Sequence, residues 1–381
     1  MLLVQVLDFE VNLNNHEWPH MSQGNLTPNL DVLIEGLKTG RFTFKNDVKE
    51  VAALWIDALL GNLIIGRLHG RLFFNQTISL LQKSLKTKKK YNLLIFKKME
   101  TISTPNYHET AVTQFIDANG TRYAYRVLGK QSGIPLITFQ HFTGSMENWD
   151  PALTNGFAKE FKVIVFDNKG VSASEGTTPD NIADMAKDAA DFIAALGYDK
   201  VNLLGFSMGG FIAQQLALDH PQLVNKMILA GTGPKGGDGI VDIITPLNHI
   251  SNMTDNDQKL YLFYSPSEES RAIGKSVLES MHKRQIDRDP NATQESIMAQ
   301  LQAIIAWGQP DEEFKDKLKS IDIPVLVVNG NNDIVVPTIN SYRLLQYLPK
   351  AKLSLYPDSN HGAIFQYHDL FLTEAIPFLK D

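Results

Sequence analysis

Short apolar runs alternate with amphipathic stretches from about residue 111 onward. Continuous apolar runs favour strands of a parallel sheet covered on both faces, whereas apolar residues at three- and four-residue spacing favour helices. Because the two patterns alternate, they predict repeated strand–helix units and an α/β fold. The predicted strands are residues 135–140, 162–167, 201–206, 226–230, 324–329 and 352–356, and helices are predicted at 181–196 and 210–218.

Right-handed crossovers between such units favour a doubly wound, mostly parallel sheet, whose functional groups gather where the strands end. Residues 234–320 separate two predicted strands and are too many for an ordinary connection. Apolar positions at helical spacing predict that this insertion is a helical cap. Within it, Ser265, Pro266 and Glu268 are typical of a helix start, with Ser265 as the capping residue.

Residues 29–82 also show helical spacing, and Gly40 lies where a first helix would end. We therefore predict a helical hairpin within a small N-terminal extension, residues 1–98. The run from Glu35 to Asn62 resembles the ligand-binding half of tetracycline-repressor-like regulators. No DNA-reading motif precedes it, so the resemblance does not imply DNA recognition. Met99 begins a fresh segment, and we hypothesise that residues 1–98 are a remnant or an upstream translation, with the α/β domain spanning 99–381.

Charge is spread unevenly along the 381 residues, which carry a net charge of −6. Residues 1–98 are net positive and the remainder is net negative. The segment 83–98 holds seven lysines and no acid. Such a run is either a solvated basic linker or an arm for anionic lipid or nucleic acid. A short basic run more often belongs to a linker, so we expect no nucleic-acid partner.

Several classes of protein are disfavoured by composition. The chain has no cysteine, which excludes disulfides, a thiol nucleophile and thiolate metal sites, and no metal-ligand cluster is evident. The longest apolar stretch, Val51 to Gly66, contains Asp57 and is shorter than the roughly 20 residues of a membrane span. The N-terminus lacks the basic start of a secretory signal, so we expect a cytoplasmic protein. Nothing in the sequence indicates an oligomeric state.

One predicted strand ends in Gly205-Phe206-Ser207-Met208-Gly209, and a helix follows directly. This G-x-S-x-G pattern places a serine on a tight strand-to-helix turn. Both glycine positions need small residues there, because side chains would collide with adjacent strands. The turn exposes the Ser207 hydroxyl, and the start of the helix aims the Met208 N–H at a developing oxyanion. Ser207 is therefore the candidate nucleophile.

Two later predicted strands end in loops that carry candidate partners for Ser207. Asp333 follows strand 324–329, and His361 follows strand 352–356. The strand before the insertion ends without a carboxylate, so Asp333 is the only candidate acid at this edge of the sheet. A serine, an acid and a histidine form the catalytic triad of several unrelated folds. Their order along the chain differs between those folds, and the order here is serine, acid, histidine.

With this order, residues 112–381 resemble cap-bearing serine hydrolases of the α/β-hydrolase fold. The resemblance implies that Ser207 is the nucleophile and that His361 takes its proton and passes it to the leaving group. It also implies that Asp333 holds the tautomer of His361 without taking the proton itself. His368, in a predicted helical stretch, is expected to be structural.

The resemblance places the second oxyanion donor in the loop that follows the first predicted strand of the sheet. The loop from His141 to Gly144 resembles the family's H-G-x-x-G loop, with Gln140 and His141 at the usual His-Gly positions. Phe142 is therefore the candidate donor, through its backbone N–H. A non-glycine at position 141 must tolerate the backbone angle that the loop requires. His141 is either a substrate-facing polar group or a hydrogen-bonded loop histidine.

Two further stretches are interpreted as structural. Residues 167–174 resemble the family's D-x-R-G-x-G-x-S stretch, with Lys169 and Ser172 in place of the arginine and the second glycine. We expect Asp167 to tie its loop against the nucleophile region and not to act as a catalytic acid. Residues 231–236 satisfy G-x-G-x-x-G, as a dinucleotide fingerprint does. Pro234 and the glycines beyond it favour an extended loop over a helix start, so no NAD, FAD or other cofactor is expected.

The serine nucleophile narrows the reaction class. Haloalkane dehalogenases and epoxide hydrolases of this fold use aspartate where Ser207 stands. Ester hydrolysis, lactone opening, C–C bond hydrolysis and cofactor-free perhydrolase activity remain, and the triad alone does not choose among them. The apolar cap favours a small, mostly apolar carboxylic ester or lactone, cleaved through an acyl-enzyme on Ser207. A different class, a non-catalytic small-molecule receptor on a hydrolase scaffold, stays open.

Overall fold

The computed structural model describes residues 12–13, 42–43 and 107–380. The chain divides into two units, Met1–Ile102 and Ser103–Asp381.

In the first unit, β1 (Asn12–Leu13) pairs antiparallel with β2 (Phe42–Thr43). The predicted helical hairpin of the N-terminal extension and its basic linker, 83–98, otherwise lie outside the described residues. The extension, its boundary at residue 98 and its origin therefore stay predictions.

The second unit is built around an eight-stranded sheet with the order β10-β9-β8-β7-β5-β6-β4-β3. β4 pairs antiparallel with both β3 and β6, and all other neighbours pair parallel. This mostly parallel, doubly wound sheet confirms the predicted α/β fold. The strands are β3 (Gln114–Ala118), β4 (Thr121–Gly129), β5 (Leu136–Phe139), β6 (Lys162–Phe166), β7 (Val201–Phe206), β8 (Val224–Ala230), β9 (Val325–Gly330) and β10 (Ala351–Tyr356).

The central strands are continuous apolar runs because both of their faces are buried. Every residue of β5, β7 and β9 is buried. Successive side chains alternate between two hydrophobic cores, as Leu203 and Leu204 of β7 illustrate. The six predicted strands are all present. Strand 201–206 matches β7 at both ends, and the ends of the others differ by at most two residues.

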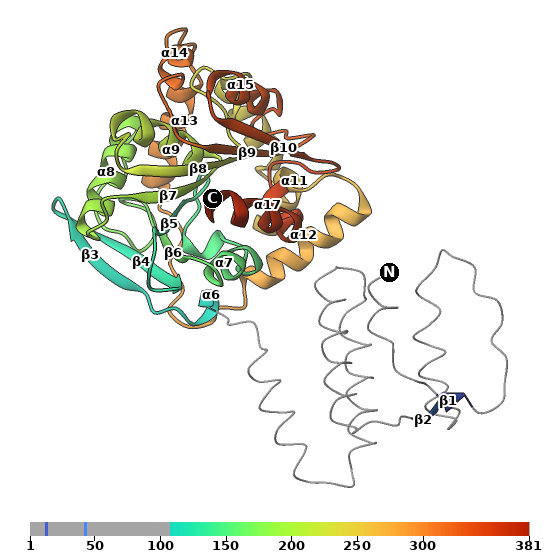
Figure 1. Ribbon diagram of the computed structural model, residues 1–381. Coiled ribbons are helices and arrows are strands. Elements are labelled where there is room, and N and C mark those ends of the chain that lie inside the picture. The colour runs from blue at the N-terminus through green and yellow to red at the C-terminus, as the bar shows by residue number, and fades with distance from the viewer. Residues whose placement is uncertain (1–11, 14–41, 44–106, 381) are drawn as a thin grey trace. The chain divides into compact units, whose positions relative to one another are not determined.

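Helices cover both faces of the sheet (Figure 1). One core includes residues of α8 (Ile182–Ala195), α9 (Met208–Asp219) and α15 (Ile339–Tyr347), and the other includes residues of α7 (Pro151–Ala158) and α17 (His368–Lys380). The remaining short helices outside the insertion are α6 (Tyr107–Thr110), η1 (Met146–Asn148) and α16 (Ala363–Gln366). None of the helices among the described residues combines the length and apolarity needed to cross a membrane.

The antiparallel hairpin of β3 and β4 was not among the predicted strands. Its turn is Asn119-Gly120, with φ of 47° and 78°. An Asn-Gly pair suits this turn because both residues tolerate positive φ. The turn signal was therefore present in the sequence, but the flanking strands lack a continuous apolar run, and residues 114–116 of β3 are exposed or half-buried.

The insertion between β8 and β9 is helical, as predicted. One feature of its prediction is wrong: α12 is capped by Ser267, whose side chain accepts the Ser270 N–H, and not by Ser265. Ser265 is buried, and its hydroxyl donates instead to the Asp358 carboxylate. The insertion comprises η2 (Ile240–Asp242), α10 (Ile244–Ile250), α11 (Asp255–Phe263), α12 (Glu268–Met281), α13 (Gln294–Gly308) and α14 (Phe314–Leu318).

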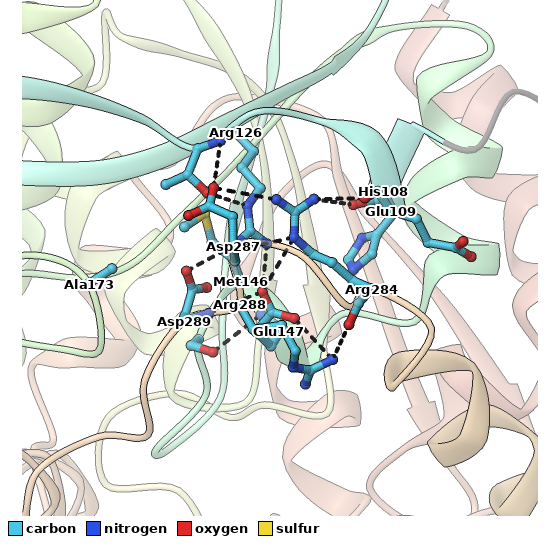
Figure 2. A network of polar contacts seen from close by, with 12 residues as sticks. His108, Glu109, Arg126, Met146, Glu147, Ala173, Arg284, Asp287, Arg288 and Asp289 are labelled. Carbon is cyan, nitrogen blue, oxygen red and sulfur yellow. Dashed lines mark hydrogen bonds and ion pairs between the residues drawn. The ribbon is translucent and has the colours of Figure 1, made fainter.

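A buried network of charged side chains joins the insertion to the sheet (Figure 2). Arg126 of β4 is 1% exposed and forms ion pairs with Glu147, at 2.8 Å, and Asp289, at 3.0 Å. Its guanidinium also donates to Thr113 Oγ1 and to the main-chain carbonyl of Asp287, both at 2.9 Å. The segment between α12 and α13 is thereby held against β4.

Two arginines of that same segment complete the network around Glu147 (Figure 2). Arg284 Nη1 donates to the carbonyls of His108 and Glu109, both at 3.1 Å, and its Nε lies 3.8 Å from Glu147. Arg288 Nη1 lies 3.5 Å from the other oxygen of Glu147. A single buried carboxylate thus faces three guanidinium groups. A buried charge without a partner destabilises the folded state. Because three arginines face Glu147, its loss leaves more charge unpaired than the loss of any other member.

We expect Glu147→Gln to lower the free energy of unfolding by about 3 kcal/mol, because it removes one partner of a buried ion network and leaves the arginines in place. The matched control is Glu160→Gln. Glu160 also faces two cations, Lys130 and Lys380, but all three side chains are more than a third exposed. The control should cost less than about 1 kcal/mol, as solvent-exposed pairs do. Urea unfolding of both variants measures the difference, and equal losses would contradict the assignment.

Candidate active site

Ser207 lies on the sharp turn between β7 and α9, with φ 58° and ψ −121°. Non-glycine residues rarely adopt positive φ, so the surrounding packing must enforce this conformation. A Cβ on Gly209 would overlap with the Phe139 carbonyl of β5, the collision with an adjacent strand that the motif predicts. A Cβ on Gly205 would instead overlap with the backbone of Gly209 and Gly210, at the start of α9. The prediction that a side chain at Gly205 would collide with an adjacent strand is therefore wrong.

The structure brings Asp333 and His361 together at the ends of β9 and β10. His361 Nδ1 lies 2.8 Å from Asp333 Oδ2, and both side chains are buried. The other carboxylate oxygen accepts the N–H groups of Val335, at 2.8 Å, and Val336, at 2.9 Å, which fixes the orientation of the carboxylate. A carboxylate accepts, so Nδ1 carries a proton, and Nε2 is the nitrogen that can accept when the ring is neutral.

The turn of Ser207 lies at the same edge of the sheet as this pair. β7, β8, β9 and β10 are successive neighbours, so the loops at their carboxyl ends are adjacent. The ring of Phe206, next to Ser207 in the chain, lies 5.0 Å from the His361 ring between centroids. No hydrogen bond joins Ser207 to His361 among the contacts of residues 107–380. In substrate-free enzymes this bond is often long and tightens only in the complex.

The loop after β5 leaves one of its backbone N–H groups unused. The His141 N–H donates to Gln140 Oε1 at 2.9 Å, the Thr143 N–H to Gln300 Oε1 at 2.9 Å, and the Gly144 N–H to the His141 carbonyl at 2.9 Å. Within the described part of the chain, no hydrogen bond takes the N–H of Phe142. The strained residue of this loop is Thr143, with φ 62°, and not His141. Position 141 thus has no special backbone requirement.

His141 is a buried, neutral residue beside His361. Its ring packs edge-on against Phe206 and Phe263, with centroids 5.5 and 5.3 Å apart. Its Nδ1 lies 2.6 Å from the Phe142 carbonyl and must donate to it. Burial lowers the pKa of His141 to about 3, although the bond to the carbonyl opposes this shift. Of the two predicted roles, the structure therefore shows a loop histidine whose ring is hydrogen-bonded.

The insertion holds the histidine loop in place. Asp358 accepts from the hydroxyls of Ser265 and Ser267, which lowers the pKa of its carboxyl. Asn360 Nδ2 donates to the Tyr264 carbonyl at 3.1 Å, and the N–H of Gly362 donates to the Phe263 carbonyl at 2.9 Å. The turn between α11 and α12 thus contacts the residues on both sides of His361. None of these contacts was predicted from the sequence.

Asp167 has the structural role expected of it, with different partners. It is fully buried, and its carboxylate accepts the N–H groups of Met146, at 2.8 Å, and Ala173, at 3.1 Å. It therefore ties the loop after β6 to the segment after β5, and not to the nucleophile turn. Burial, together with the nearby Asp289, raises the pKa of Asp167. Ser172, in the glycine position of this stretch, adopts φ 52°.

Across residues 107–380 and the two short strands, no cluster of three or more His, Asp or Glu residues is arranged to hold a metal ion. The chemistry available at this edge of the sheet is that of a buried imidazole–carboxylate pair, a serine on a strained turn, and main-chain donors.

Comparison with known proteins places these features in context. The model of the alpha/beta hydrolase fold family matches residues 134–366. An alpha/beta hydrolase fold protein from Chitinophaga pinensis has a solved structure that is 46% identical, with a TM-score of 0.70, covering 72% of this chain and 100% of that one. The structure of Est816, described as an N-acyl homoserine lactone degrading enzyme, is 25% identical with a TM-score of 0.52, covering 70% and 100%.

A curated relative is named as the hydrolase of a substituted dienoic acid. The 2-hydroxy-6-oxo-6-(2'-aminophenyl)hexa-2,4-dienoic acid hydrolase of Metapseudomonas resinovorans is 26% identical over 278 residues, which cover 71% of this chain and 91% of that protein.

We expect Gly209→Ala to lower the free energy of unfolding by about 3 kcal/mol, because its Cβ would overlap with a main-chain carbonyl that cannot move without shifting β5. The control is Gly120→Ala in the β3–β4 turn, where a Cβ meets open space and only the positive φ is unfavourable, at about 1 kcal/mol. Urea unfolding compares the two, and a cost for Gly209→Ala no larger than for the control would show that the turn is not tightly packed.

Proposed function

Because the chain belongs to the alpha/beta hydrolase fold family, we propose that it is a serine hydrolase that cleaves small, mostly apolar carboxylic esters or lactones through an acyl-enzyme on Ser207. The observation that carries the proposal is the buried pair of His361 and Asp333, at 2.8 Å, in loops at the same edge of the sheet as the turn of Ser207. With Nδ1 donating to Asp333, Nε2 of His361 is the atom that can act as a general base.

In the proposed reaction, Ser207 Oγ attacks the acyl carbonyl while its proton passes to His361 Nε2. The bond between the acyl carbon and the leaving oxygen then breaks, and the same proton moves to that oxygen. In a second round water attacks the acyl carbon and gives its proton to His361. The bond between that carbon and Ser207 Oγ then breaks, the proton passes from His361 to Ser207 Oγ, and the acid is released. Asp333 stabilises the imidazolium that forms in each round and keeps its own protonation state.

The backbone N–H groups of Phe142 and Met208 are the proposed oxyanion donors. The Phe142 N–H is the one left unused in its loop. Met208 is the first residue of α9, where N–H groups have no partner within the helix and favour negative charge. Two such donors, fixed before substrate binds, stabilise the charge that develops on the carbonyl oxygen.

Two observations support the substrate class. The His361 ring packs against Phe206 and Phe263, and both of these rings pack against Phe365. The ring centroids lie 5.0 to 6.1 Å apart, so the surroundings of the base are apolar. Est816 is described as degrading N-acyl homoserine lactones, in which the lactone ring is a cyclic ester and the acyl chain is attached through an amide. The relative from Metapseudomonas resinovorans favours a second candidate, hydrolysis of a C–C bond next to a ketone by the same residues.

Labelling with a fluorophosphonate, followed by peptide mass spectrometry, tests the proposal because the reagent reacts with activated serines. We expect one adduct, on Ser207, and none in Ser207→Ala or His361→Ala. Turnover of a panel of acyl esters and lactones should fall on the order of 10⁶-fold in either variant. Asp333→Asn should lower kcat by about 10⁴-fold, because the histidine then takes the wrong tautomer.

His368→Ala is the matched control, since its Nδ1 contacts only the Phe365 carbonyl, at 3.2 Å, and Asp150, at 3.7 Å. It should keep the adduct and the turnover. Turnover of a vinylogous diketone in the absence of ester or lactone cleavage would favour the C–C bond hydrolase. A wild-type protein that binds these compounds without an adduct or turnover would overturn the proposal and favour the receptor alternative.

A further inference from the structure

The peptide unit between Phe142 and Thr143 is held at both of its polar groups. Its carbonyl accepts from His141 Nδ1 at 2.6 Å, and its N–H donates to Gln300 Oε1 at 2.9 Å. This peptide is joined through the Cα of Phe142 to the peptide that carries the Phe142 N–H, so holding it restricts the directions in which that N–H can point. The two contacts fix one side of the proposed oxyanion hole before substrate binds.

This conformation needs outside support because Thr143 is a β-branched residue with φ 62°. Such residues are genuine outliers at positive φ and persist only where the surroundings over-determine them. His141 is a neighbour in the chain, so its contact is local. Gln300, by contrast, comes from α13 of the insertion, 157 residues further along the chain.

Gln300 is itself fixed by a short chain of buried hydrogen bonds. Its Nε2 donates to Ser296 Oγ at 3.0 Å, and that oxygen accepts the hydroxyl of Thr178 at 2.8 Å. Gln300, Ser296 and Thr178 are all buried, at 1%, 3% and 7% exposure. The donor bond to Ser296 sets the orientation of the amide, which leaves Oε1 facing Thr143.

Gln300 and Met208, the residue of the second proposed donor, both line a cavity of about 10 Å³, together with residues of the loop after β6. The contact of Gln300 with Thr143 therefore links α13 of the insertion to the loop that supplies the first proposed donor.

We propose that Gln300 is a positioning residue of the oxyanion hole, through which the insertion sets the orientation of the Phe142 N–H. It acts on the Phe142–Thr143 peptide and does not touch the reacting atoms. The inference rests on the proposed function. Its consequence is that α13 must be docked for the site to be complete, so that the insertion contributes to the chemical step as well as to the shape of the pocket.

Gln300→Met tests this, because methionine fills a similar volume and lacks the acceptor oxygen. With an ester that the wild type cleaves, kcat should fall about 10- to 100-fold, as expected when a catalytic group is misplaced, while KM changes less than about 3-fold. Affinity for a trifluoromethyl ketone, which forms an oxyanion adduct with the serine, should fall by the same factor as kcat/KM. Gln300→Glu keeps an acceptor oxygen and should recover most of the rate.

Gln302→Met is the matched control, because Gln302 lies on the same helix and is exposed. It should leave kcat and the ketone affinity unchanged. Ser296→Ala provides a second variant should Gln300→Met fail to fold. It removes the acceptor that Nε2 shares with the Thr178 hydroxyl but leaves Gln300 Oε1 in place, and it should lower kcat a few-fold with KM unchanged.

Three outcomes are distinguishable. Unchanged kcat and ketone affinity in Gln300→Met, with wild-type turnover and the Ser207 adduct present, would overturn the role of Gln300 and leave the proposed function standing. A loss that appears in KM alone would also overturn it, since it would assign Gln300 to substrate binding. Absence of adduct and turnover in the wild type would overturn both proposals.

Discussion

The turn that carries Ser207 is the constraint on which the rest of the site depends. A side-chain-bearing residue at φ 58° is held there because Gly209 backs onto the Phe139 carbonyl and Gly205 onto the start of α9. That packing sets how closely α9 approaches both β7 and β5. The loop after β5 then necessarily lies beside the serine, as do the loops after β9 and β10, since parallel strands end at one edge. The strained turn and the order of the strands together determine which loops surround Ser207.

The insertion contacts the site at two separate places. The turn between α11 and α12 binds the residues that flank His361, through Asp358 and Asn360, and α13 reaches the loop of Phe142 through Gln300. A segment that enters the chain between two core strands thus supports the loop of the proposed base and that of a proposed oxyanion donor. In this fold the sheet places the loops at one edge, and the insertion fixes their conformations.

Local signals made much of this predictable. Apolar runs predicted six strands, most clearly β5, β7 and β9, in which every residue is buried, and the G-x-S-x-G pattern located the tight turn at Ser207. Long-range contacts were not predictable. The sequence pointed to Ser265 as the cap of α12, whereas Ser267 takes that role, and both serines donate to Asp358, more than 90 residues away, a contact that no local pattern indicates. Nothing next to Gln300 in the chain marks it, since its partner is 157 residues distant. The β3–β4 hairpin had a local signal, but its outer strand is too exposed to form an apolar run.

The buried network around Arg126 has a consequence for the order of folding. Arg126 and Asp289 are 163 residues apart, and the entropy of closing a loop grows with its length. Contacts of such separation form only once the intervening sheet and helices have brought the ends together. During synthesis Arg126 and Glu147 leave the ribosome well before Asp289, Arg284 and Arg288 exist. Docking of the α12–α13 segment is therefore the step that completes this network, and until then the charges that become its centre remain in water.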